Sequence, residues 1–410
     1  MLGGTPSIHA AYGFPLKLTG VISGSPSQVT IKAGGAVEWS GSQGNTYTGI
    51  VKVDLSSELV LKKTAGQAVT GPVEMGGGKL TLGASNQIAD TAPVWFSGNG
   101  VFNVNGYSET VLTVYGSVTA ALVLGDGTLT LAGNSTNQLG SAAQQVRIQG
   151  SPLSSIHKKG TGTWTVYRGD YPVGGDQSTA LYVEAGKVQL QVNWQGSIFL
   201  TGGTLEGNAI TGSITNNGGT LNLTTLQPKG VTTPGTGGTL ACNINSEVPG
   251  TGFGRLQVTG TVNLTGLTLN LALNYQPLNN ETFTIIDNDS NDAVTGIFNG
   301  MPEGSTIYAG GQPFKITYKG GSGANDVVLL FTGIGAPDPQ ITLVRPQPDG
   351  TVRIDVSWQP SKTLTLERGV NGGLAQWTTA KSVTLDGQGK ATVFVSAGGT
   401  KREFFRLRTN

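Results

Sequence analysis

Residues 158–190 read KKGTGTWTVYRGDYPVGGDQSTALYVEAGKVQL, and this stretch decides the fold. Two short segments in it, GTWTVYRG and YVEAGKVQL, alternate apolar and polar residues, and a loop with glycines joins them. Alternation with a period of two is typical of a β-strand, because successive side chains point to opposite faces. The rest of the chain repeats this unit with variations, which predicts an all-β protein built from repeats.

A recurring phrase extends the pattern: glycine, one or two small polar residues, then an alternation that ends in Leu or Val. Its apolar position falls at Leu80, Leu129, Trp164, Leu205, Leu221 and Leu240. The last two gaps, 16 and 19 residues, suit one coil of a β-helix, which holds about three short strands with their turns. The longer gaps suit two coils, or one coil with an insertion. One coil cannot bury its leucine face alone, so stacked coils are expected to share a ladder of hydrogen bonds. Residues 1–254 are therefore predicted to form a parallel β-helix (a β-solenoid), and a globular all-β sandwich is the alternative.

Composition indicates an extracellular protein. Glycine accounts for 65 of 410 residues, and charged residues make up only 12%, about half the usual fraction. Neutral polar side chains therefore solvate the surface. With a formal net charge of +1 and no basic block, we expect no nucleic-acid partner and no binding to anionic lipid. No apolar run approaches the roughly 18 residues of a transmembrane segment.

Cysteine and histidine are too few for the sites that they usually build. Cys242 is the single cysteine, so no intrachain disulfide is expected, and its setting TLACNI favours a buried, unreactive thiol. The chain has two histidines, His9 and His157, and this count alone excludes a histidine-rich metal site. The N-terminus lacks a basic region followed by an apolar core, so export is inferred from composition and resemblance.

Residues 158–190 resemble the passenger-associated transport repeat of bacterial autotransporter passenger domains. That repeat has the phrase K-x-G-x-G-T-L-T-L-x-G, then a Gly-Gly-Thr loop, then a strand that enters A-G-x-L-x-L. Here Trp164 replaces the usual leucine, and Gly174 and Gly175 occupy the loop. The resemblance covers about 33 residues and implies a secreted bacterial β-helix.

Residues 255–332 resemble the segment that closes the β-helix in many secreted proteins of this autotransporter type. The pieces QVTGTVNL, FTIIDND, GIFNGMPEG and ITYKGGSGANDVVL occur in the family's order. The resemblance implies antiparallel strands here, and a cap is also needed physically, because an open end exposes unpaired strand edges. The family's pattern of roughly ten-residue amphipathic strands does not follow, so no outer-membrane barrel is expected in this sequence.

The last part of the chain is predicted to be a separate small domain. Residues 333–340 (GIGAPDPQ) form a linker with two prolines. About seven short strands follow in residues 341–410, a spacing that suits a β-sandwich of immunoglobulin or fibronectin III type. The phrases LERGVNGGLAQW and FFRLRTN resemble C-terminal modules of secreted bacterial surface proteins, which implies a role in attachment or sorting.

One acidic turn is a candidate calcium site. The stretch IIDNDSNDAVTG contains Asp287, Asp289 and Asp292, whose oxygens are the hard ligands that Ca²⁺ selects. The spacing begins like an EF-hand loop, but the glycine at its position six and the glutamate at its position twelve are missing. The alternative is a solvated turn. A single KGGSGANDVVL phrase with Asp326 is similar to the repeat of calcium-binding β-rolls, but one copy cannot build such a roll.

Two further groups could support carbohydrate chemistry. β-Helices also host polysaccharide lyases and hydrolases, and Asp170 with Asp176 could form the carboxylate pair, about 5–10 Å apart, that glycoside hydrolysis needs. The other ionisable groups of this region are Lys158, Lys159 and Arg168. A solvated loop is the preferred interpretation. Trp95 with Phe96 could form a sugar-stacking platform, but filling or capping the core is the preferred interpretation.

These observations predict a secreted or cell-surface structural or adhesive protein of bacterial type, which self-assembles into a filament in one variant of the hypothesis. Its expected partners are an extracellular or cell-surface glycan and a second copy of itself. The chain is expected not to be an enzyme and to use no cofactor besides the candidate calcium. The alternatives are a carbohydrate-active β-helix enzyme and a trimeric phage or virus tail spike.

Overall fold

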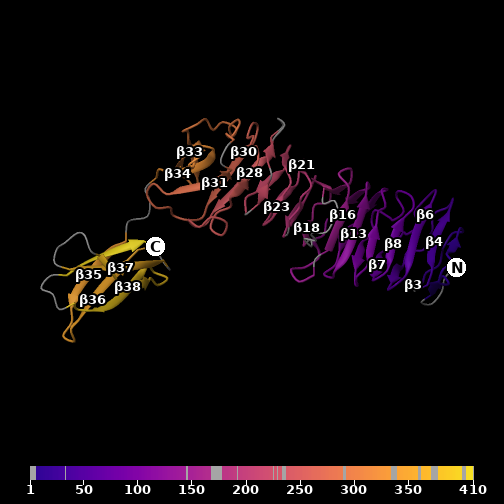
Figure 1. Cartoon of the computed structure of the whole chain (residues 1–410), viewed down its shortest axis with the longest axis horizontal. Helices are drawn as coiled ribbons and strands as arrows, with labels where there is room; N and C mark the ends of the chain where they lie inside the picture. Colours follow the sequence, from indigo (N-terminus) through magenta and orange to yellow (C-terminus); the bar gives the residue numbers. More distant parts are fainter. Residues whose placement is uncertain are drawn as a thin grey trace. The chain divides into compact units, whose positions relative to one another are not determined.

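The computed structural model describes residues 6–32, 34–144, 146–167, 178–191, 193–224, 226–228, 230–232, 237–289, 292–333, 339–358, 362–370, 377–398 and 403–409. All regular structure in these residues is β-strand, so the protein is all-β, as predicted (Figure 1). None of them forms a helix long and apolar enough to cross a membrane. The chain divides into two compact units, Met1–Tyr275 with Thr282–Leu330, and Gln276–Glu281 with Phe331–Asn410.

Two parallel sheets dominate the N-terminal part of the first unit. The first sheet has the order β1 (Ser7–His9), β3 (Gln28–Lys32), β5 (Ile50–Asp54), β7 (Val73–Gly76), β9 (Val94–Phe96) and β12 (Val114–Tyr115). The second has the order β16 (Val146–Gly150), β13 (Ala120–Gly125), β10 (Val101–Asn103), β8 (Lys79–Leu82), β6 (Glu58–Lys63), β4 (Ala36–Gly41) and β2 (Leu16–Leu18). Strands of the two sheets alternate along most of this part of the chain, so each sheet is assembled from every second strand.

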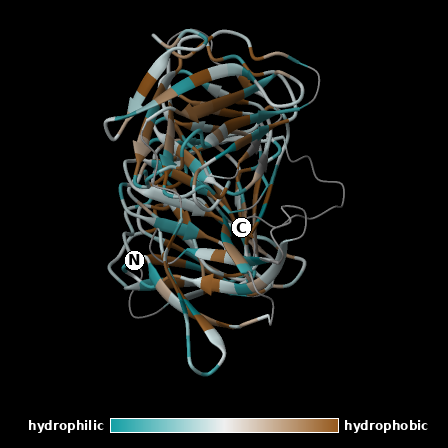
Figure 2. Ribbon diagram, turned by 90° about the vertical axis from the view of Figure 1, so that its left-hand side faces the viewer, coloured by the Kyte–Doolittle hydropathy of each residue, from teal (hydrophilic) through white to brown (hydrophobic). Residues whose placement is uncertain are grey.

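The pairing register repeats every 20 to 22 residues in the first sheet. Val29 pairs with Val51, Val51 with Val73, Val73 with Val94 and Val94 with Val114. We call the stretch between two such paired positions a repeat. All five valines are fully buried, and each contributes about 1.5–3 kcal/mol of hydrophobic stabilisation. Hydrophobic and hydrophilic residues alternate along the strands in Figure 2, as the strand period requires.

Two more parallel sheets continue the first unit. The third sheet has the order β11 (Ser108–Val111), β14 (Thr128–Leu131), β17 (Ser155–Lys158), β19 (Ala180–Val183), β21 (Ile198–Leu200), β24 (Ile214–Asn216) and β27 (Val231–Thr232). The fourth has the order β15 (Asn137–Leu139), β18 (Thr163–Val166), β20 (Lys187–Leu190), β22 (Thr204–Gly207), β25 (Thr220–Asn222), β28 (Thr239–Ile244) and β30 (Thr268–Leu273). A two-stranded sheet pairs β23 (Ile210–Thr211) with β26 (Gln227–Pro228).

The predicted phrase positions fall in three of these sheets rather than in one series. Leu205, Leu221 and Leu240 pair successively in the fourth sheet, so the gaps of 16 and 19 residues are each one pairing step. The longer gap before Leu205 holds two steps, because Val188 pairs with both Trp164 and Leu205. Leu80 belongs to the second sheet and Leu129 to the third, because the same alternating pattern suits any strand with one buried face.

Glycines stack where the third and fourth sheets meet, which explains the recurring Gly-Gly-Thr phrase. A Cβ at Gly186 would lie 2.5 Å from the carbonyl oxygen of Gly160, and one at Gly219 would lie 2.6 Å from that of Gly203. A Cβ at Gly203 would meet the Val183 Cγ1 atom at 2.6 Å. The backbones of adjacent repeats therefore approach each other too closely for any side chain at these turns.

A mixed sheet follows these repeats. Its order is β29 (Leu256–Val258), β31 (Thr282–Asn288), β34 (Asp326–Phe331), β33 (Gln312–Gly320) and β32 (Thr306–Ala309). β29 pairs with β31 in parallel, whereas β31–β34 and β32–β33 are antiparallel. Phe283 lies in its core, edge-on to Phe253 and Phe314. Antiparallel pairing therefore occurs in residues 255–332, where the resemblance implied it.

The second unit contains two three-stranded antiparallel sheets. One has the order β35 (Gln340–Pro346), β36 (Thr351–Ser357) and β39 (Lys390–Ser396), and the other β38 (Trp377–Thr384), β37 (Thr363–Val370) and β40 (Glu403–Thr409). Buried side chains from both, including Ile354 and Leu366, form one core. About seven strands were predicted here, with QWTTA (376–380) and SVTL (382–385) as two of them. The described residues contain six strands, because these two segments form the single strand β38. A bulge in its pairing with β37, between Leu366 and Glu367, keeps that strand continuous.

Candidate functional site

Charged side chains on the outer faces pair across adjacent repeats. Lys17 and Glu38 are directly opposed in register, with Nζ and Oε1 3.1 Å apart. Lys52 pairs with Glu74 at 3.1 Å and Lys79 with Glu58 at 2.9 Å, again between opposed residues. Such partly exposed pairs contribute at most about 1 kcal/mol each. Their common geometry nevertheless shows that these charges connect one repeat to the next.

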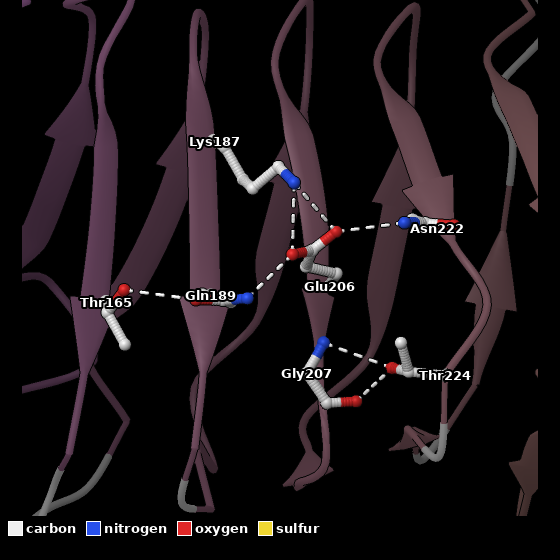
Figure 3. Close-up of polar contacts among 7 residues, drawn as sticks. All are labelled: Thr165, Lys187, Gln189, Glu206, Gly207, Asn222 and Thr224. Carbon is white, nitrogen blue, oxygen red and sulfur yellow. Dashed lines mark hydrogen bonds and ion pairs between the residues drawn. The ribbon is translucent and has the colours of Figure 1, made fainter. Parts of the chain in front are cut away.

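A polar cluster on the fourth sheet centres on Glu206 in β22 (Figure 3). Its Oε1 accepts hydrogen bonds from Lys187 Nζ at 3.1 Å and Gln189 Nε2 at 2.8 Å. Its Oε2 accepts from Lys187 Nζ at 3.0 Å and Asn222 Nδ2 at 2.9 Å. Thr165 extends the line by donating to Gln189 Oε1 at 3.1 Å. The cluster thus joins four consecutive strands, β18, β20, β22 and β25.

The electrostatics of Glu206 suit a structural carboxylate. Only 8% of the residue is exposed. Burial acts to raise the pKa of Glu206, but the hydrogen bonds from Asn222 and Lys187 outweigh it and lower this pKa below its ordinary value. A general acid near neutral pH needs the opposite shift. Glu206 therefore stays ionised and is suited to holding Lys187, Gln189 and Asn222 in place.

An aromatic column follows the outer face of the third sheet. His157, Tyr182 and Phe199 occupy matching positions of β17, β19 and β21. The rings of His157 and Tyr182 stack with centroids 4.3 Å apart at 4°, and those of Tyr182 and Phe199 at 4.7 Å and 15°. The Nδ1 atom of His157 lies 2.6 Å from Glu184 Oε1, and Lys159 Nζ lies 3.7 Å from Glu184 Oε2.

The rings of the aromatic column stack on one another, so the faces of the central ring are not open to a ligand. A sugar stacks on the flat face of an aromatic ring, but both faces of Tyr182 are covered by His157 and Phe199. Stacked aromatic pairs contribute about 0.5–1.5 kcal/mol beyond the area that they bury. The column therefore stabilises the stacking of three repeats and is poorly suited to binding a glycan along its length.

A second polar line runs through the interior, where buried side chains bond the backbone of the next repeat. Asn45 accepts a hydrogen bond from the Ile22 N–H at 2.9 Å and donates one to the Ala68 carbonyl at 2.7 Å. Gln87 accepts from the Lys63 N–H at 2.7 Å and donates to the Lys63 carbonyl at 3.1 Å. These contacts satisfy backbone groups that the ladders leave unpaired.

Glu109 ends this interior line. Its Oε2 accepts from the backbone N–H groups of Gln87 at 2.7 Å and Ile88 at 3.3 Å. Burial raises the pKa of Glu109 to about 7. Residues 63–67 and 85–87, which include Gln87, line an open groove of about 410 Å³. The Lys63 Nζ donates to the Gly20 carbonyl at 2.8 Å, so this buried cation also contacts protein backbone.

The predicted catalytic candidates are only partly described. Arg168, Asp170 and Asp176 lie outside the described residues. Lys158 is buried, its Nζ donates to the Gly160 carbonyl, and burial lowers its pKa to about 8. Lys159 is half exposed and pairs with Glu184.

The predicted calcium ligands lie in and after β31. Asp287 pairs with Arg255, with Oδ2 and Nη1 3.1 Å apart. A hydrogen bond between the Asp289 and Asp292 carboxyl groups raises the pKa of Asp289. In the described part of the chain no three histidine, cysteine or acidic side chains gather as a metal site would require. Calcium at these residues stays a prediction, which thermal denaturation with and without Ca²⁺ would test.

Two smaller predictions can be checked by burial. Cys242 is 1% exposed, so the prediction of a buried thiol is confirmed. Burial raises the pKa of this thiol to about 12, which fits the predicted lack of reactivity. Phe96 points into the core and is 3% exposed, which confirms core packing for Phe96 and excludes a platform made of both rings. Trp95 instead stacks on Tyr115 of the next repeat, with ring centroids 6.4 Å apart.

The balanced charge of the whole chain conceals an uneven distribution. Residues 341–410 contain ten Lys and Arg against five Asp and Glu, whereas residues 1–340 contain fifteen against nineteen. In the second unit, Arg406 and Arg408 lie on the outer side of β40, and the guanidinium of Arg406 lies over the ring of Trp377. The whole-chain charge hides this cluster, and a separate charge count for the C-terminal segment would have revealed it.

No family model matches the chain, and no curated protein matches it.

Proposed function

We propose that the first unit is a parallel β-helix, and that the chain is a secreted or cell-surface structural or adhesive protein. The observation that carries the proposal is the pairing of outward charges between neighbouring repeats, as in Lys52–Glu74 and Lys187–Glu206. These pairs connect neighbouring repeats and hold opposite charges within the protein, which suits a structural role.

The internal packing supports the same proposal. Stacked repeats bury a continuous apolar column and contact mainly their neighbours, which is how solenoid proteins obtain their stability. The valine series from Val29 to Val114 and the glycine contacts at Gly186, Gly203 and Gly219 both fit such a stack. A stack of this kind suits a structural role, because its repeats keep fixed positions relative to one another.

In this proposal the second unit attaches the protein to its partner. Two three-stranded antiparallel sheets over one core fit a small β-sandwich. The resemblance of its last strand to modules of bacterial surface proteins supports a role in attachment. The autotransporter-type relationship and the extracellular location belong to the same proposal and rest on the motifs in residues 158–190 and 255–332.

The proposal is tested on the purified full chain by two measurements. Electron microscopy is expected to show an elongated first unit, and incubation with neutral and uronic-acid polysaccharides is expected to release no new chain ends. Turnover that disappears in Asp170→Asn or Asp176→Asn would show an enzyme instead. Sedimentation distinguishes a tail spike from a filament, because a spike requires a trimer of fixed mass, whereas filament growth increases with protein concentration.

A further inference from the structure

One outer sheet face of the second unit combines aromatic and cationic side chains. We define the Trp377 face as Glu367, Gly369, Trp377, Phe404, Arg406 and Arg408, on strands β38, β37 and β40. Gly369 is opposed to Trp377 on one side and to Phe404 on the other, and Glu367 is opposed to Arg406. Opposed residues of antiparallel strands point to the same face, so these side chains share one surface.

Glycine at position 369 lets the indole of Trp377 lie flat on the sheet. A Cβ on Gly369 would lie 3.2 to 3.4 Å from three carbons of the six-membered part of this ring. The guanidinium of Arg406 lies over the same ring, with Cζ 4.3 Å from its centroid. A cation held over tryptophan in this way is attracted by the electrons of the ring. Trp377 therefore fixes the position of the Arg406 charge.

The two arginines share one buried carboxylate. The Nε atom of Arg406 donates to Glu367 Oε2 at 2.6 Å, and Arg408 Nη1 lies 3.7 Å from Glu367 Oε1. The Glu367 side chain is 7% exposed, whereas those of Arg406 and Arg408 are 49% and 70% exposed. The face therefore presents positive charge to solvent and keeps its negative charge underneath. Phe404, 46% exposed, adds an apolar surface beside them.

We propose that the Trp377 face binds an acidic polysaccharide, one that carries carboxylate or sulfate groups. Planar guanidinium groups bind such anions through paired hydrogen bonds, and the fixed position of Arg406 reduces the entropy lost on binding. Residues 341–410 have an excess of five positive charges, which attracts a polyanion to this segment. The inference deepens the adhesive part of the proposed function and rests on it for the biological role, but the binding itself is a separate property.

The spacing of the charges favours a polysaccharide over a nucleic acid. Duplex DNA carries one charge per about 1.7 Å, and tight binding to it requires a dense row of cations. Arg406 and Arg408 are two residues apart on one strand, about 7 Å. The Glu367 carboxylate contacts both. Charges placed once per sugar along a glycan match this sparse arrangement better, and the exposed Phe404 offers a surface to the apolar side of a sugar ring.

Affinity electrophoresis of the full chain tests the proposal. Gels contain polygalacturonate, heparin, neutral dextran or no polymer, and isothermal titration calorimetry with the retarding polymer gives the affinity. The unmodified chain is expected to be retarded by a charged polymer and not by dextran. Arg406→Gln with Arg408→Gln is expected to weaken binding about tenfold. The matched control, Arg345→Gln with Arg353→Gln, removes the same charge from the other sheet and is expected to change binding less than twofold.

Three results would overturn the proposal. The first is an unmodified chain that neither charged polysaccharide retards, and the second is equal weakening in both double variants, which indicates net charge alone. The third is tighter binding to DNA or to anionic lipid vesicles than to either polysaccharide. Thermal denaturation confirms that both double variants fold. The proposed function is tested separately, by electron microscopy and by incubation with polysaccharides. A chain that binds no acidic polysaccharide can still give the expected results in those two tests, so the two failures are distinguishable.

Discussion

The carboxylate of Glu109 accepts a hydrogen bond from the backbone N–H of Gln87, 2.7 Å away in the preceding repeat. Burial raises the pKa of Glu109 from 4.5 to about 7. A folded-state pKa above the unfolded value means that the folded protein binds the proton more tightly. The stabilisation from Glu109 is therefore complete below about pH 4.5 and is lost as the pH rises through 7.

Glu109→Gln imitates the protonated acid and is expected to remove this pH dependence. The variant should match the unmodified chain at pH 4 and exceed its free energy of unfolding by about 3 kcal/mol at pH 8, as an upper estimate from the pKa shift. Urea denaturation at pH 4, 6 and 8, followed by tryptophan fluorescence, measures the difference. Equal destabilisation of the variant at every pH would contradict the assignment.

Gly219→Ala is expected to destabilise the repeats by about 1–3 kcal/mol, because the added methyl group would contact the Gly203 carbonyl at 2.6 Å. Gly20→Ala provides a matched control, because a Cβ there has open space around it. The control should be neutral or slightly stabilising, since alanine restricts the unfolded chain. Thermal denaturation of both variants compares them directly. Similar melting temperatures would refute the close stacking of the glycine turns.

Tyr182→Ala interrupts the aromatic column and should cost about 2–3 kcal/mol, because two stacked contacts and their buried area disappear together. Tyr308→Ala is the control, since that side chain is 69% exposed. Chemical denaturation reports the difference in unfolding free energy. An equally small effect of both substitutions would mean that the stacking of His157, Tyr182 and Phe199 adds nothing to stability.

Glu206→Ala should destabilise the fourth sheet by about 2–3 kcal/mol, because Lys187, Gln189 and Asn222 then lose their shared acceptor. Glu58→Ala removes a more exposed carboxylate and should cost less than about 1 kcal/mol. The lowered pKa of Glu206 predicts that its stabilisation is present above about pH 4.5 and is lost as the pH falls further. The gap between the two variants should therefore close in acid, which denaturation at pH 3 and pH 7 would show.

Local pattern predicted the strands well, because alternation is decided by neighbouring residues. Leu205, Leu221 and Leu240 are in one paired series, as their spacing indicated. Which sheet a strand joins depends on contacts with residues a full repeat away, and the alternation of Leu80 and Leu129 contains no such information. For the same reason β38 was predicted as two strands, since a bulge opposite Leu366 has no clear signal in its own sequence.

Functional predictions depended even more on distant contacts. Trp95 and Phe96 are adjacent in sequence, but a strand turns them to opposite faces, so only Trp95 reaches the surface. The position of the Arg406 guanidinium depends on Trp377 and Gly369, which lie on two other strands. One signal for this cationic face is present in the sequence, namely the excess of basic residues after position 340. The net charge of the whole chain does not show it.

The valine series has a consequence for how such a chain can change in length. Because Val51, Val73 and Val94 occupy equivalent places, duplication or loss of one whole repeat by unequal recombination leaves every other register intact. A single-residue insertion within a strand instead turns its apolar side chains outward. The first sheet can therefore gain or lose whole strands, about 4.8 Å for each one, and selection can change the number of repeats without redesigning their core.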